Sequence, residues 1–158
     1  MSRMWNPPRL YRVVAIAEVI TWTMLIAGMI MKYGLRLGET GDLAVRIGGG
    51  IHGFVFLAYC VTTVLIGVDQ RWGLGRILLG LGSAVVPYLT VPFERWAARK
   101  GMLGEQWRLR HEDGRGLIEK LAAFAVRRPI PAALITLVAV SVVFFLLLQA
   151  GPPWEWFS

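Results

Sequence analysis

Four long apolar stretches, almost free of charge, are the feature that most constrains the fold of this chain. The hydrocarbon layer of a bilayer is about 30 Å thick, so an apolar run of about 18 or more residues is typical of a transmembrane helix. No water is available there to satisfy the backbone, so such runs are helical. The sequence therefore predicts an all-α integral membrane protein with four transmembrane helices, at residues 13–31, 50–68, 77–93 and 130–150. The third stretch is short and contains Pro87 and Pro92, so a re-entrant course is its alternative.

The basic residues predict an orientation. The chain carries 17 Lys and Arg against 10 Asp and Glu, and the basic residues gather at the ends of the apolar stretches. Basic residues in these places are typical of contact with the anionic headgroups of a lipid bilayer, so we expect the bilayer to be the partner and expect no binding of nucleic acid. Four crossings put twelve Lys and Arg in the first and third loops, against five in the N-terminus, second loop and tail. We therefore expect a bacterial cytoplasmic (inner) membrane protein, multi-pass, with both termini extracytoplasmic.

The composition divides the chain into three parts. Residues 1–101 form a unit of three membrane helices, residues 102–129 a basic, amphipathic linker, and residues 130–158 a fourth transmembrane helix and tail. Within the linker, the helical spacing of Leu117 and Leu121 predicts a cytoplasmic amphipathic helix near residues 115–128. A solvated linker is the alternative.

Two ionisable residues, Glu18 and His52, lie within the apolar stretches, where charge is costly and generally faces the helix bundle. From the helical rise, Glu18 lies roughly 8–9 Å below the outer surface and His52 about 3–5 Å from the inner surface. The two side chains are then more than ~15 Å apart and do not touch.

This spacing predicts two separate polar layers. The residues available at each depth define them: Glu18 with Thr62 or Thr63 and Ser83 in the outer layer, and His52 with Glu94 and Lys32 in the inner layer. Glu18 is interpreted as a carboxyl group that locks helix packing, or alternatively as a proton or ligand site. His52 fixes the inner helix ends, or alternatively makes a pH-sensitive contact.

Small residues on the second apolar stretch predict close helix packing. Gly53, Cys60 and Gly67 are seven residues apart on one helical face, and Gly49 lies four residues before Gly53. No cysteine–histidine cluster has the spacing of a metal site, and no residue set suits nucleophilic catalysis. We therefore expect no metal, no cofactor and no catalytic residues.

Several short motifs resemble a known family. They are Arg12–Glu18, Met31–Tyr33, the segment Gly50–Tyr59 with its His52-Gly53 dipeptide, and Pro87–Glu94. Together they resemble the domain of unknown function 3817, a family of small bacterial integral membrane proteins with a His-Gly motif in the second helix. The resemblance covers about residues 9–101 and implies a three-helix membrane unit without an established activity. The chain departs from the common pattern at Val19, where a glycine is usual, and at Ile30-Met31, where Pro-Leu is usual.

Two functions follow as expectations. The first is a non-catalytic accessory subunit or assembly factor, whose partners are other membrane-protein subunits or further copies of the chain. The alternative is a small oligomeric proton-coupled transporter that uses Glu18 and His52 as titrating groups. An enzyme that acts on lipid is a third class, for which no catalytic set is present in the motifs.

Overall fold

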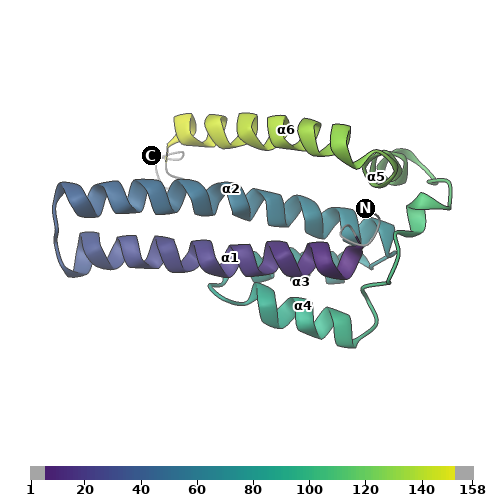
Figure 1. Ribbon diagram of the computed structural model, residues 1–158, viewed down its shortest axis with the longest axis horizontal. Helices are drawn as coiled ribbons and strands as arrows, with labels where there is room; N and C mark the ends of the chain where they lie inside the picture. The colour runs from purple at the N-terminus through teal and green to yellow at the C-terminus, as the bar shows by residue number, and fades with distance from the viewer. Residues whose placement is uncertain (1–5, 152–158) are drawn as a thin grey trace.

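The fold is a bundle of helices, seen in a computed structural model that describes residues 6–151 (Figure 1). No strand occurs among these residues. Because the described residues end at 151, the tail predicted after the fourth helix lies mostly outside them. The elements are α1 (Pro7–Met29), the wider π-helical turn η1 (Ile30–Gly34), α2 (Glu39–Asp69), α3 (Leu74–Val85), α4 (Thr90–Arg99), the short 3-10 turn η2 (Arg108–Arg110), α5 (Leu117–Arg127) and α6 (Pro129–Ala150).

Helices α1 and α2 form a long antiparallel hairpin that is the centre of the bundle (Figure 1). The Asn6 side chain accepts a hydrogen bond from the Arg9 N–H (3.2 Å), which caps the start of α1. Only residues 35–38 separate η1 from α2. The backbones come very close at Gly28, where an added Cβ would lie 2.9 Å from the Ala44 carbonyl carbon. Such close approach is how helices pack tightly in a membrane.

Helices α3 and α4 form a hairpin that enters and leaves at one end of the bundle. Helix α3 runs beside the C-terminal half of α2, so that Gly80 faces Thr63. Helix α4 returns beside the N-terminal half of α1, where Thr90 Oγ1 donates a hydrogen bond to the Ala15 carbonyl (3.0 Å).

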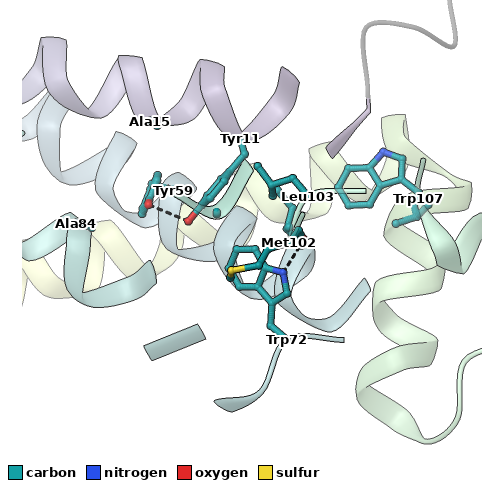
Figure 2. Packing of buried hydrophobic residues seen from close by; sticks show 11 residues of the cluster. Tyr11, Ala15, Tyr59, Trp72, Ala84, Met102, Leu103 and Trp107 are labelled. Carbon is teal, nitrogen blue, oxygen red and sulfur yellow. Dashed lines mark hydrogen bonds between the residues drawn. The ribbon is translucent and has the colours of Figure 1, made fainter. Parts of the chain in front are cut away.

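The two ends of this hairpin are joined directly. Trp72, just before α3, donates a hydrogen bond from its indole N–H to the carbonyl of Met102, just after α4 (2.9 Å; Figure 2). The prediction of one continuous helix over residues 77–93 is therefore wrong. Helix α3 ends at Val85, Pro87 lies in the turn, and Tyr88 adopts a positive φ of 66°. With 12 residues, α3 is only about 18 Å long, too short to cross the hydrocarbon layer.

Three described helices are long and apolar enough to span a membrane: Pro7–Gly34, Glu39–Asp69 and Pro129–Ala150. The count of four spanning helices is not confirmed. The prediction that both termini lie on one side of the membrane assumed four crossings, and the three candidate spans do not support that assumption. The amphipathic helix expected near residues 115–128 is present as α5, which lies across the end of the bundle (Figure 1).

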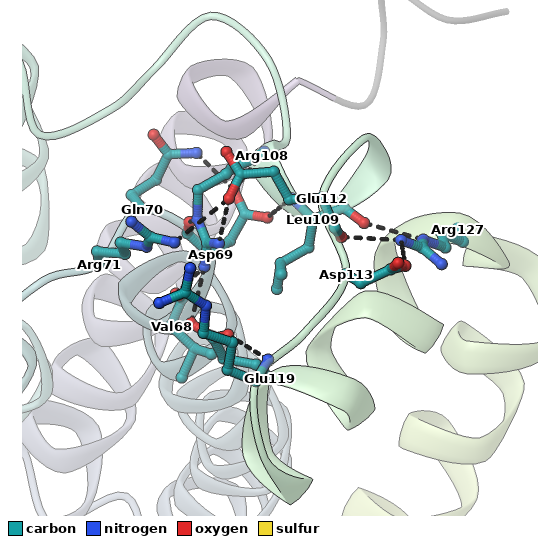
Figure 3. Close-up of polar contacts among 11 residues, drawn as sticks. Val68, Asp69, Gln70, Arg71, Arg108, Leu109, Glu112, Asp113, Glu119 and Arg127 are labelled. Carbon is teal, nitrogen blue, oxygen red and sulfur yellow. Dashed lines mark hydrogen bonds and ion pairs between the residues drawn. The ribbon is translucent and has the colours of Figure 1, made fainter.

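The polar segment before α5 is fastened to the end of α2 through Asp69, which is fully buried (Figure 3). Asp69 accepts hydrogen bonds from the backbone N–H groups of Arg108 (3.1 Å) and Leu109 (2.9 Å). The Arg108 guanidinium also pairs with Glu119 (3.0 Å). The N–H of Arg115 (2.7 Å), followed by the Arg108 guanidinium, lowers the pKa of Glu119 below its ordinary value.

Candidate functional site

Glu18 of α1 and His52 of α2 meet in the middle of the bundle. The His52 Nδ1 lies 3.7 Å from Glu18 Oε2 and 3.1 Å from the Thr21 hydroxyl. The Trp22 ring lies against the imidazole, with ring centroids 4.3 Å apart. Glu18 is fully buried and His52 is 8% exposed, so this pair is enclosed by protein.

The Glu18 carboxyl group is unusual because no described residue donates a hydrogen bond to either of its oxygens. An isolated charge is very costly at this depth. The pair is therefore best described as holding one proton, either on Glu18 with a neutral imidazole or on His52 with an ionised carboxylate. Chemically, it can bind, hold or release a proton.

The prediction that these residues lie in separate layers is wrong. It assumed that the second helix starts at Gly50, but α2 starts at Glu39. His52 thus lies about 20 Å along the helix from its start, not at the membrane edge. The short connection between η1 and α2 then brings His52 to the level of Glu18 and Thr21.

A second polar cluster lies nearer the start of α1, between α1, α2 and α3, around two stacked tyrosines (Figure 2). The Tyr11 and Tyr59 hydroxyls are 2.8 Å apart. Thr63 lies 3.1 Å from the Tyr11 hydroxyl, and Ser83 lies 2.9 Å from the Tyr59 hydroxyl. Thr63 and Ser83 were expected beside Glu18. That placement is wrong, because the Thr63 and Ser83 hydroxyls are hydrogen-bonded to the Tyr11 and Tyr59 hydroxyls instead. Thr62 instead donates to the Ala58 carbonyl of its own helix (2.8 Å).

The other predicted ionisable residues are apart from His52. Glu94, which is buried, pairs with Arg12 at 3.5 Å, so its expected contact with His52 is wrong. Lys32 pairs with Asp42 at 2.9 Å, where α1 is connected to α2 at the opposite end of the bundle. Lys32 therefore does not belong to the layer in which it was placed.

The predicted packing residues contact different neighbours. Gly67 adjoins Ile77 of α3, Gly53 adjoins Phe144 of α6, and Gly49 is in ordinary contact with Leu25. Cys60 is half-buried and packs against the core.

The closest contacts of α2 with η1 and α1 involve residues that the sequence prediction missed. An added Cβ on Gly41 would lie 2.6 Å from Lys32 Cα, and one on Gly48 would lie 3.0 Å from the Met24 carbonyl oxygen. Their seven-residue spacing is the signal that could have identified this face.

The described residues contain no group of three or more His, Cys, Asp or Glu side chains that could hold a metal ion. Fold and site together define a small helical membrane protein with an enclosed carboxyl–imidazole pair. The family model of the domain of unknown function DUF3817 matches residues 8–99, so the chain belongs to this family and the resemblance is confirmed.

The comparisons add one relative. A protein of Streptomyces coelicolor named "Putative membrane protein SCO5905" is 44% identical over 96 residues, which are 60% of this chain and 11% of that protein. The chain thus spans only a small part of the length of this relative. No solved structure matches.

Proposed function

We propose that this protein is a non-catalytic subunit or assembly factor of a larger membrane complex. The observation that carries the proposal is the exposed tip of the α3–α4 hairpin. At the tip, Val86, Tyr88 and Leu89 are 49%, 42% and 41% exposed, and the backbone is not helical from Val86 to the start of α4.

The depth of the tip gives this exposure its meaning. The Trp22 indole N–H donates to the Ala84 carbonyl (3.3 Å), and Trp22 lies about 22 Å along α1 from Pro7. The tip is therefore near the middle of the hydrocarbon layer. Irregular backbone at that depth is stable only when protein covers it or it lines a water-filled cavity. A partner subunit seated on the tip supplies such cover.

The relative supports the same proposal. About nine-tenths of the Streptomyces coelicolor protein lies outside the matched region, so there the family unit is built into a much longer chain. The proposed accessory role likewise places the family unit of this protein beside further protein.

The proposed orientation in the bacterial inner membrane follows from three crossings. Fourteen Lys and Arg then belong to the end that holds the N-terminus and residues 94–129, against three near the α1–α2 connection. The N-terminus is cytoplasmic and the end of α6 extracytoplasmic. In a Cys60→Ser background, a membrane-impermeant thiol reagent should label Leu37→Cys in intact cells and Arg110→Cys only after lysis. The reverse pattern would refute this orientation.

The partner proposal is tested by site-specific photocrosslinking in native membranes. A benzoylphenylalanine at Val86 should crosslink one protein in stoichiometric amounts, which mass spectrometry identifies. The control position is Leu146, which is 59% exposed on α6 and should crosslink lipid. Crosslinks from Val86 to lipid alone, or only to a second copy of this chain, would contradict the accessory role.

The contact between Glu18 and His52 favours a second function, proton-coupled transport. An enclosed pair that holds one proton is the type of group that proton relays use. In proteoliposomes, Glu18→Gln should abolish a pH-dependent flux that Glu39→Gln, at the exposed start of α2, leaves intact. A flux that survives Glu18→Gln, or no flux in the wild-type protein, removes this candidate.

A further inference from the structure

A narrow groove separates α6 from α2 at the end of the bundle where α5 lies. Its volume is about 290 Å³, and its wall is almost entirely apolar. Ala58 and Leu65 of α2 form one side, and Ala133 and Val140 of α6 form the other. From Pro129 to Val140 the groove follows α6 for about 16 Å.

The size of the groove decides which kind of molecule fits it. A helix about 10 Å across occupies roughly 1,200 Å³ over the same length, more than all the space between the groove walls, which is about 990 Å³ with the open side included. A single acyl chain is far thinner. The bilayer itself supplies such chains at the open side of the groove.

Charge at the mouth of the groove selects the headgroup. Arg110 is the charged residue in the groove wall, and it is exposed. Its neighbours Arg108 and Arg127 already form ion pairs, Arg108 with Glu119 and Arg127 with Asp113. Within the described residues, the Arg110 guanidinium makes no ion pair and no hydrogen bond.

We infer that the groove between α2 and α6 binds an anionic phospholipid, with one acyl chain between the helices and the phosphate on Arg110. Basic pockets between membrane helices at the cytoplasmic side are suited to anionic headgroups. Trp107 also lines the groove and is buried, so its ring forms part of the apolar wall. This site is independent of the hairpin tip and of the Glu18–His52 pair.

The test is native mass spectrometry of the full-length protein, purified in mild detergent and titrated with phosphatidylglycerol or phosphatidylcholine of identical acyl chains. The wild-type protein should retain one phosphatidylglycerol and prefer it over phosphatidylcholine. Arg110→Gln should lower that preference about fivefold, the effect of one basic residue near the surface. The matched control Arg95→Gln removes an exposed charge from α4, at the same end but away from the groove, and should keep the preference.

A second pair of variants tests the acyl-chain position. Ala133→Trp fills the groove and should abolish retention of the lipid, whereas Ala139→Trp, at an exposed position outside the groove wall, should leave retention unchanged. Three results would overturn the inference: no preference in the wild-type protein, equal losses for Arg110→Gln and Arg95→Gln, or unchanged retention in Ala133→Trp.

Discussion

The register of the α1–α2 hairpin can be tested with a single methyl group at Gly28. A Cβ at this position would lie 2.9 Å from both the carbonyl carbon and the oxygen of Ala44, and 3.0 Å from the Val45 nitrogen. All three are backbone atoms, so no side-chain rotation can relieve the contact and the helices have to separate. Overpacking of this kind costs about 1–3 kcal/mol, while replacing a helical glycine with alanine returns about 0.8 kcal/mol. Gly28→Ala should therefore lower the free energy of unfolding by about 1 kcal/mol.

Gly50 provides the matched control, because a Cβ there meets nothing within 4 Å. Gly50→Ala should raise the free energy of unfolding by about 0.5–1 kcal/mol through helix propensity alone. The assay is unfolding of the protein in mixed dodecylmaltoside–sodium dodecyl sulfate micelles, followed by far-UV circular dichroism. Shifts of opposite sign support the register, whereas two variants that shift together would show that Gly28 does not lie against Ala44.

Two further predictions concern polar contacts. Tyr59→Phe removes the hydroxyl that is hydrogen-bonded to both Tyr11 and Ser83. It should lower the free energy of unfolding by about 1–3 kcal/mol, because two buried partners each lose a hydrogen bond. An unchanged midpoint in the same micelle titration would argue against this network. Because the N–H of Arg115 holds the pKa of Glu119 below 4.5, its stabilising contribution is complete above pH 4.5 and disappears as the pH falls through the folded pKa. Thermal unfolding should therefore separate wild type from Glu119→Gln at pH 6, and the two curves should converge as the pH falls through the folded pKa. A difference that stays constant over the whole acid range would contradict this reasoning.

Apolar length predicted α6, and the helical spacing of apolar residues predicted α5. The stretch at residues 130–150 matches α6, and the spacing of Leu117 and Leu121 matches α5. In both cases the apolar pattern begins and ends close to the residues where the helix begins and ends. A proline marks the start of α6 at Pro129.

The position of His52 could not be predicted in the same way, because apolarity does not mark where a helix starts. Helix α2 begins at Glu39, eleven residues before the predicted start at Gly50. The added segment contains Arg46 and other polar residues, so a hydropathy reading assigns it to a loop. Helical hydrogen bonds continue past the apolar run, since they do not depend on side-chain polarity. The resulting error in depth separated two groups that are 3.7 Å apart.

The third apolar stretch shows a different limit of sequence reasoning. Pro87 raised the alternative of a re-entrant course, but local chemistry does not decide between a kinked helix and a turn. Contacts distant in sequence decide it: the hydrogen bond from Trp72 to Met102 holds both ends of the hairpin at one side. Pro92 lies in the first turn of α4, where it costs no helical hydrogen bond.

Trp22 joins the two features on which the proposed functions rest. Its ring lies 4.3 Å from the His52 ring, and its indole N–H donates to the Ala84 carbonyl at the end of α3. That carbonyl belongs to the last turn of α3, where carbonyl groups have no intrahelical donor. At the depth proposed for the tip, no water is available to bind it either. Trp22 therefore connects the end of α3 with the His52 ring, which itself lies 3.7 Å from Glu18. The subunit proposed to sit on the tip would thus lie next to the Glu18–His52 pair, so the two proposed functions concern neighbouring parts of the bundle.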